Sequence, residues 1–400
     1  MRAVFGRLLV AVLLVALGSS GPAWAQAPAP EKKEEKPKTI WEETNLFAYI
    51  ENSATFNLTG AGRGGTNELR FYDFDEGYTF NIAEFSIKKD PSEKYPFGYG
   101  LVVTTGIDSQ KNHSLGIFRS EEDAFAFRNT KKFDFQEMYL SATVPLGSGL
   151  TIKAGKWVTL LGYEVIESPN NLNFSRGYLF TFGIPLTHTG GLLSYTLTDW
   201  FSVTAGVVVG WDNSEDNNGR PSYTGQFAFT PLKDFTANLN WIAGPEQNDQ
   251  STHQRYALDF VFGYTGIKNL TLAADVLYGH EDKEASLVAA DTRQNTNASW
   301  WAWAAYAAYD WTEKLRTALR LEYFDDPDGV RTAAIAPGTN VELYDVTATV
   351  QYKIWKGLVG RVEYRHDNAN RKVFKREDHG TTPTSTSLDT ISLSLYYSFF

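Results

Sequence analysis

Charged side chains occupy alternate positions in several segments in which apolar and polar residues also alternate. Side chains at this spacing lie on one face of a β-strand. The residues on these polar faces are Lys153, Arg316, Arg320, Glu322, Arg361, Glu363 and Arg365. Charged groups on a wall that faces water set the local electric field and concentrate ions of one sign. Selection between ions is therefore the chemistry that these residues could do.

Two interpretations of the four arginines stay open. Arg316 and Arg320 fall on one predicted strand, and Arg361 and Arg365 fall on the second strand after it. The four could form a basic patch that favours anions. Alternatively, they could pair with the glutamates of the same strands in a solvated wall.

Catalytic and metal chemistry has little support. The 400 residues include no cysteine, and the six histidines form no metal-ligand pair at helical spacing. Neither a Gly-x-Ser-x-Gly motif nor a phosphate-binding loop occurs. The alternating polar residues of 212–218 resemble calcium ligands, but no glutamate closes the loop, so a solvated turn is favoured. We expect no metal or cofactor, and the net charge of −10 disfavours nucleic acid as a partner.

The N-terminus has the pattern of a secretory signal. Arg2 and Arg7 precede the apolar run 8–17, and Ala23-Trp24-Ala25 is a cleavage site of the small-x-small type. The run is too short for a membrane anchor. A mature chain beginning at Gln26 is expected, in an exported protein.

The strand pattern continues to the C-terminus. Between 388 and 400 the apolar residues Ile391, Leu393, Leu395, Tyr397 and Phe399 alternate with polar ones, while Phe400 falls out of phase. About sixteen such segments follow one another from Leu46, and their connections are alternately short and long. This pattern is typical of an all-β, antiparallel transmembrane β-barrel with short periplasmic turns and long outer loops. The last strand should then seal against the first, Leu46 to Leu58.

The positions of aromatic residues support two membrane interfaces, because rings of an ordinary core would not sort to the strand ends. One set lies beside the short turns and the C-terminus: Trp200, Phe235, Tyr264, Trp311, Trp355 and Tyr397. A second set lies at the opposite strand ends: Trp211, Trp241, Tyr278, Tyr323 and Tyr364. The predicted divisions are a signal peptide, 1–25, a flexible periplasmic tail, 26–40, and a barrel, 41–400.

The long connection 157–187 contains more apolar residues than a surface loop of that length would carry, which favours packing inside the barrel. It is the candidate constriction loop, with Glu164, Glu167 and Arg176 as its charged residues. We expect Glu164 and Arg176 to narrow the pore and bias its ion preference. Packing of this loop on the rim is the alternative.

One block of sequence resembles a known family. It runs from Glu137 to Trp211 and includes Ser168-Pro169-Asn170-Asn171, Phe174-Ser175-Arg176-Gly177 and Pro185-Leu186-Thr187-His188-Thr189-Gly190. It is similar to the outer-membrane beta-barrel porin family called porin-2, or OmpL-like, and the segment from Asn67 to Gly98 is similar too. The resemblance implies an outer-membrane channel of a Gram-negative-type bacterium but no substrate. The terminal aromatic resembles the signal read by the barrel-assembly machinery.

The leading functional interpretation is a porin through which small hydrophilic solutes or ions diffuse passively. Outer-membrane lipid, the assembly machinery and these solutes are the expected partners, and monomer and homo-oligomer both remain open. One alternative is a structural or adhesive barrel occluded by its own loop. The other is a lipid hydrolase built on a barrel, for which only His188, with serines in its region, offers support.

Overall fold

A computed structural model describes residues 39–59, 77–117, 132–282, 296–332, 338–375 and 383–399. Within these residues, sixteen antiparallel strands close a barrel, which confirms the predicted fold class. The barrel strands are β1 (Asn45–Asn57), β2 (Gly77–Lys89), β3 (Phe97–Thr105), β4 (Phe133–Val144), β5 (Leu150–Val158), β6 (Thr187–Thr198), β7 (Phe201–Val208), β8 (Ser222–Leu232), β9 (Phe235–Pro245), β10 (Gln254–Ile267), β11 (Leu270–Glu281), β12 (Ala298–Asp310), β13 (Leu315–Asp326), β14 (Val341–Trp355), β15 (Leu358–Ala369) and β18 (Ser387–Ser398). The predicted signal peptide and most of the predicted tail lie outside the described residues.

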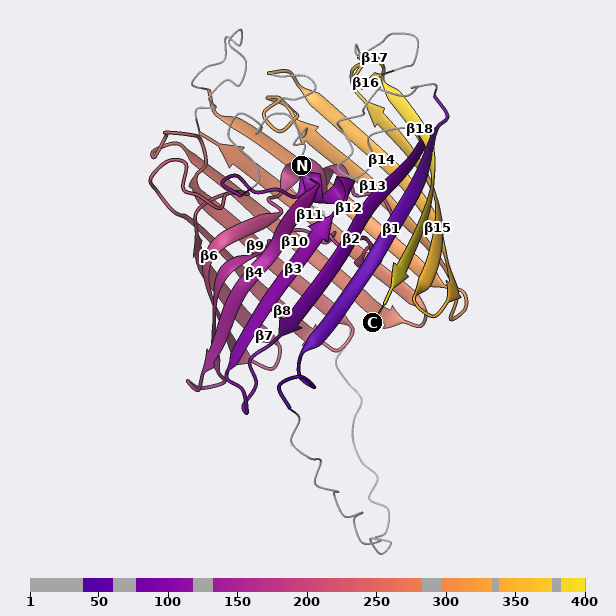
Figure 1. The fold of residues 1–400 in the computed structure, drawn as a ribbon. Coiled ribbons are helices and arrows are strands. Elements are labelled where there is room, and N and C mark those ends of the chain that lie inside the picture. Colours follow the sequence, from indigo (N-terminus) through magenta and orange to yellow (C-terminus); the bar gives the residue numbers. More distant parts are fainter. Residues whose placement is uncertain are drawn as a thin grey trace, which may run out of the picture. The chain divides into compact units, whose positions relative to one another are not determined.

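Each barrel strand pairs with its neighbours in the sequence, and β18 closes the ring against β1 (Figure 1). The register places Phe56 opposite Ile391 and Ile50 opposite Tyr397. The backbone N–H of Phe399 donates to the carbonyl of Ala48 at 2.9 Å, so pairing continues to the last described residue. The predicted seal between the first and last strands is therefore confirmed. Phe400, predicted to be out of phase, lies outside the described residues.

The alternation of residue types separates an apolar outer face from a polar inner face. On β13, Leu319 and Leu321 are each 39% exposed, whereas Arg320 between them is fully buried. On β12, whose sequence left the outward face unassigned, Trp301 and Trp303 point outward, whereas Ala302 between them points inward. A closed barrel satisfies every strand edge, which is what lets such an apolar surface face lipid.

The predicted alternation of connection lengths is also present. The short connections, such as 145–149 and 233–234, lie at one rim, and the long ones lie at the other (Figure 1). The long connections hold the helix α1 (Ile107–Lys111) and a small sheet of β16 (Phe374–Lys375) and β17 (Pro383–Ser385). In the described part of the chain, no helix has the length and apolar character needed to cross a membrane.

Candidate functional site

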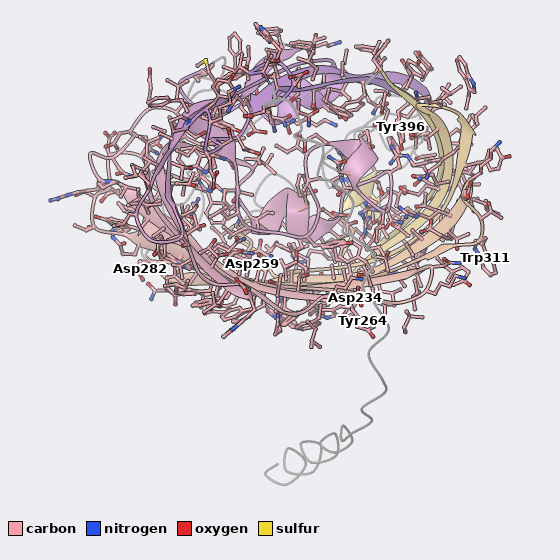
Figure 2. The ribbon with its side chains drawn as sticks, turned by 90° about the horizontal axis from the view of Figure 1, so that it is seen from below. Asp234, Asp259, Tyr264, Asp282, Trp311 and Tyr396 are labelled. Carbon is pink, nitrogen blue, oxygen red and sulfur yellow. The ribbon has the colours of Figure 1, made fainter. Side chains whose placement is uncertain are left out.

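The connection between β5 and β6, residues 159–186, lies inside the barrel. We call it the inner segment. It contains a short 3-10 helix η2 (Ser168–Asn170) and a π-helix η3 (Leu179–Gly183). Seen along the barrel, parts of the chain occupy the space within the ring of strands, with Asp259 on the adjacent wall (Figure 2). The inward course predicted for this connection is therefore what the structure shows.

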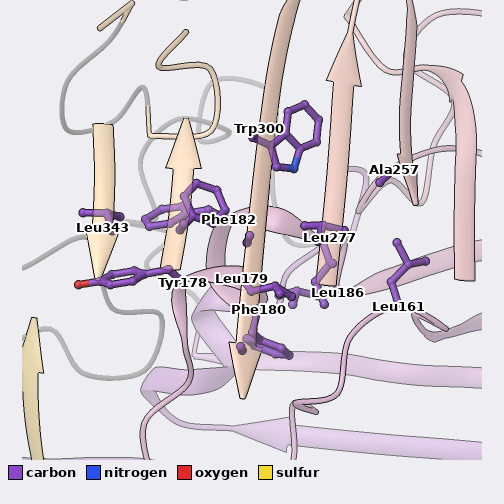
Figure 3. Close-up of a cluster of buried hydrophobic side chains, with 14 of the residues drawn as sticks. Leu161, Tyr178, Leu179, Phe180, Phe182, Leu186, Ala257, Leu277, Trp300 and Leu343 are labelled. Carbon is purple, nitrogen blue, oxygen red and sulfur yellow. The ribbon is translucent and has the colours of Figure 1, made fainter. Parts of the chain in front are cut away.

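The inner segment rests on a patch of small and aromatic side chains. Ala302 and Ala304, on the inner face of β12, are almost completely buried and belong to the same apolar cluster as η3. Phe182 packs on Phe324 of β13 with 5.9 Å between ring centroids. Trp300, Phe182 and Leu179 belong to this cluster (Figure 3). The indole of Trp300 donates to the carbonyl of Gly183 at 3.1 Å. The alanines leave the room that the helix needs against the wall.

Carboxylates of the wall accept hydrogen bonds from the backbone of the inner segment. Glu322 on β13 takes the N–H groups of Tyr178 and Leu179 at 2.7 and 2.6 Å. The same arrangement recurs, with N···O distances of 2.6 to 2.9 Å, for Asp259 with Gly162, Asp275 with Tyr163, and Glu363 with Phe174 and Ser175. Buried N–H groups of a loop need such acceptors, because an unpaired one costs about 1–3 kcal/mol.

Arginines of the wall act as donors, and the inner segment supplies the acceptors. Arg320 donates to Oε1 of Glu164 at 2.7 Å and to the carbonyl of Ser175 at 2.6 Å. Arg365 donates to the carbonyl of Arg176 at 2.7 Å. The wall thus supplies donors and acceptors that together fix one course of the segment.

The charged partners of the wall arginines differ from those considered from the sequence. Arg320 and Arg365 share Asp345, at 3.0 and 2.6 Å. Arg361 on β15 pairs with Glu51 on β1, across the intervening strand β18, and donates to the carbonyl of Ser168 at 3.1 Å. Glu322 and Glu363, the partners considered from the sequence, accept from the inner segment instead. Glu51 and Asp345 lie on other strands than the arginines they pair with, so the local sequence around each arginine does not predict these ion pairs.

Two of the predicted wall residues are only partly buried. Arg316 makes a two-pronged ion pair with Asp310 at 2.7 and 2.9 Å. The ammonium of Lys153 lies 4.2 Å from the ring centroid of Tyr139. The other five, Arg320, Glu322, Arg361, Glu363 and Arg365, are at most 3% exposed, because the inner segment covers them.

The three charged residues predicted for the constriction loop all lie in the inner segment. Glu164 accepts two hydrogen bonds, one from the N–H of Gly177 at 2.6 Å and one from the guanidinium of Arg320 at 2.7 Å. Arg176 is 1% exposed and donates to backbone carbonyls of its own segment, including that of Phe174 at 2.7 Å. Gln136 donates to Glu167 at 2.7 Å, and burial, with nearby Glu137, raises the pKa of Glu167.

A second inward connection, 106–117, did not stand out in the sequence. Its helix α1 contains Asp108 and Ser109, both at most 1% exposed, and packs on β2, β3 and β4. The N–H of Leu115 donates to the carbonyl of Asp212 at 2.8 Å. One local signal exists at Gly106, where φ is 130° and a Cβ atom would lie 2.3 Å from a carbonyl oxygen of β2.

The polar residues of 212–218 serve the turn and its neighbours. Asp212 accepts the N–H groups of Leu186 and Thr187 at 2.7 and 3.0 Å, which fixes the end of the inner segment. Asp216 accepts the N–H of Gly219 at 2.7 Å. No cluster of three or more His, Cys, Asp or Glu side chains suited to a metal ion occurs among the described residues.

The closed sixteen-stranded barrel, its apolar outer face and its polar interior with an inward connection define an outer-membrane β-barrel of the porin class. The chain belongs to the family described as "Putative beta-barrel porin-2, OmpL-like", whose model matches residues 44–399. The predicted outer-membrane location is thereby confirmed, and so is the porin role. No curated protein matches the chain.

Solved structures share the fold at low sequence identity. The outer membrane channel DcaP of Acinetobacter baumannii is 13% identical with a TM-score of 0.59, covering 89% of this chain and 97% of that one. The anion-selective porin from Comamonas acidovorans is 10% identical with a TM-score of 0.56, covering 89% and 99%. OmpT of Vibrio cholerae, in a trimer form, is 12% identical with a TM-score of 0.55, covering 89% and 99%.

Proposed function

We propose that this porin carries small hydrophilic solutes or ions by passive diffusion through a water-filled lumen, and that the inner segment sets its narrowest part. The observation that carries the proposal is the double fastening of the segment to the wall. Wall carboxylates hold its backbone N–H groups, and wall arginines hold its carbonyls. A segment fixed in this way narrows the passage by a constant amount, as a size filter requires.

The charged residues divide into two proposed roles. Lys153 and Arg316 are partly exposed on the inner face, and we assign them to the lining of the water-filled passage. The buried wall residues Arg320, Glu322, Arg361, Glu363 and Arg365, with Glu164, Glu167 and Arg176 of the segment, shape the passage by holding the segment in place. Their effect on ion preference is then exerted through the position of the segment.

Single-channel recording in planar bilayers, with neutral sugars of increasing size and asymmetric salt, tests both parts. Conductance with a sugar cut-off supports the channel, and its absence from folded protein would refute it. Glu164→Gln and Arg176→Gln should each change the sugar cut-off and the reversal potential. Reversal potentials identical to wild type in both variants would contradict a role for these residues. Lys153→Gln should shift the reversal potential toward cation preference and leave the cut-off unchanged.

An occluded structural or adhesive barrel is the second candidate. The observation that favours it is the extensive apolar packing of the inner segment on the wall. Liposome swelling separates the two, because an occluded barrel admits no sugar. We assign no enzymatic activity to the chain, and hydrolysis of a lipid ester by the purified protein would contradict that assignment.

We assign the remaining partners on chemical grounds. The apolar outward face suits outer-membrane lipid, the C-terminal strand suits the barrel-assembly machinery, and residues 1–25 suit export as a cleaved signal. A homo-oligomer is proposed by analogy with the trimer form of OmpT. Sedimentation in detergent would show whether the purified barrel is a trimer or a monomer.

A further inference from the structure

Arg331 differs from the arginines of the barrel wall. It lies in the connection between β13 and β14, at the rim with the long connections. Its Nε donates to the carbonyl of Phe182 in the inner segment at 2.6 Å. Its two terminal nitrogens have no hydrogen-bond acceptor among the described residues, and its side chain is only partly buried. A guanidinium with two unused parallel N–H donors is suited to an incoming anion.

Two tryptophans hold this guanidinium in place. Its central carbon lies 4.9 Å from the ring centroid of Trp211 and 5.2 Å from that of Trp300. The two indoles pack edge to face with 6.1 Å between centroids. Both are buried, Trp211 at 7% exposure and Trp300 at 0%. The prediction that Trp211 belongs to a membrane-interface set is therefore wrong, because its ring packs against these buried side chains. The planar cation is therefore positioned by aromatic contacts and by Phe182 before any ligand arrives.

A second arginine lies on the same tryptophan. The central carbon of Arg255 is 5.4 Å from the ring centroid of Trp211. Arg255 is neutralised by Glu281, which accepts from its Nε and Nη2 at 3.0 and 2.9 Å. Burial and then Arg255 lower the pKa of Arg331 to about 10, although nearby Glu281, Asp326 and Asp212 act in the opposite direction. Arg331 therefore carries its charge near neutral pH, and among the described residues no carboxylate forms an ion pair with it.

The carboxylates around this pair accept hydrogen bonds from other donors. Glu246 takes the N–H of Trp211 at 2.6 Å and the hydroxyl of Ser222 at 2.5 Å. The others are Asp212, which accepts from Leu186 and Thr187, and Asp326, which accepts from the N–H groups of Val330, Arg331 and Thr332. None of them is bonded to the terminal nitrogens of Arg331.

We propose that Arg331, Arg255, Trp211 and Trp300 form an anion-binding site at the outer mouth of the barrel, in which the two terminal nitrogens of Arg331 take two oxygens of a carboxylate or a phosphate. This proposal rests on the proposed channel function, because a binding site at the mouth would act on solutes that the channel carries. A solute anion would be held at the mouth before it passes the inner segment.

Isothermal titration calorimetry on the full chain, folded in detergent micelles, tests the site without relying on conduction. Inorganic phosphate and propanoate are titrated separately at constant ionic strength, which shows whether the oxygens come from a phosphate or a carboxylate. Wild type should bind one of them saturably. Arg331→Gln should weaken that binding at least about tenfold, because a charge-assisted pair of hydrogen bonds is lost.

Two further variants make the result specific. Arg331→Lys keeps the charge but loses the two-donor fork, so it should bind with intermediate affinity. Arg220→Gln, at an exposed arginine of the connection between β7 and β8, removes the same charge elsewhere and should bind as wild type does. Absence of saturable binding in wild type, or equal affinity in wild type and Arg331→Gln, would overturn the site.

The channel and the site can fail independently. A folded protein that conducts salt in bilayers but binds neither anion refutes the site and leaves the channel proposal standing. A protein that binds one anion through Arg331 but conducts nothing supports the site and refutes the channel proposal.

Discussion

Arg320 and Glu164 are 156 residues apart in the sequence, yet Nη1 of the arginine lies 2.7 Å from Oε1 of the glutamate. This ion pair joins β13 to the inner segment, and both side chains are at most 3% exposed. A buried pair of this kind fixes geometry more than it adds free energy, because desolvation offsets much of the attraction. Removing one partner, however, leaves an uncompensated buried charge.

Arg320→Ala should release the inner segment. Glu164 and Asp345 lose their shared cation, and the expected loss in the free energy of unfolding is about 3–5 kcal/mol. Single-channel conductance and the sugar cut-off should rise, and urea unfolding in lipid vesicles should shift to lower denaturant. Arg316→Ala is the matched control, because its pair with Asp310 is over a third exposed on both sides and should contribute less than about 1 kcal/mol. Equal losses in the free energy of unfolding in the two variants would contradict this explanation.

Ala304→Leu should displace η3 from its packing position against the inner face of β12. The inner face there is fully packed, and inserting a larger side chain into such a site costs about 1–3 kcal/mol. The expected readout is altered conductance, with faster hydrogen exchange in residues 179–183. Ala307→Leu places the same side chain on the lipid-facing side of the same strand and should leave conductance unchanged. Unchanged conductance in Ala304→Leu would show that packing against β12 does not position η3.

The stability of the second inward connection, residues 106–117, in its docked position should depend on pH. Burial raises the pKa of Asp108 to about 8 from 3.8, although Lys111 and Arg176 act in the opposite direction. Between these two values the folded state holds a proton that the unfolded state has released. The stability of this region therefore falls as pH rises from about 4 to 8, by at most about 1.4 kcal/mol per pH unit.

Hydrogen exchange of residues 106–114, corrected for the intrinsic pH dependence of exchange, measures this effect. Between pH 5 and pH 8, protection should be greatest at pH 5 and should decline steadily toward pH 8. Asp108→Asn stays neutral throughout and should remove the decline. A slope that persists in the asparagine variant would assign the effect to another group.

Deletion of Phe399 and Phe400 should impair assembly. Phe399 is the last described residue that pairs with β1, and its ring packs on Tyr397 with 4.9 Å between centroids. The heat-modifiable, folded fraction in outer membranes should fall on gel electrophoresis. A chain with Phe399→Tyr keeps an aromatic ring and should assemble as wild type does. Full assembly of the deleted chain would mean that its C-terminal aromatics are not the signal.

The barrel was predictable because its information is local. Strand alternation and the alternate connection lengths can be followed over ten or fifteen residues, and the closing strand repeats a single pattern to Phe399. The inner segment was also detectable, because Leu161 and Ile166 are out of place in a surface loop. The lipid-facing side of β12 was not, since tryptophan and alanine occur on both of its faces.

The partners within the interior were not predictable. An inward arginine in a sequence looks the same whether it faces water or lies under a loop, and Arg320 and Arg365 lie under one. Their shared partner Asp345 lies on the polar face of a different strand, and nothing in its local sequence distinguishes it from the other acidic residues there. The inward connection 106–117 is polar throughout most of its length, so hydrophobic pattern gave no indication that Asp108 is buried. Only contacts across the barrel distinguish these cases.

The contacts between the inner segment and the barrel wall also constrain the order in which the barrel assembles. The segment is synthesised before β10 to β15, whose side chains supply its hydrogen bonds from Gly162 to Leu179. The segment therefore has no place to dock until the C-terminal half of the barrel has formed. The passage can reach its final width only after β15, which carries Glu363, is in place.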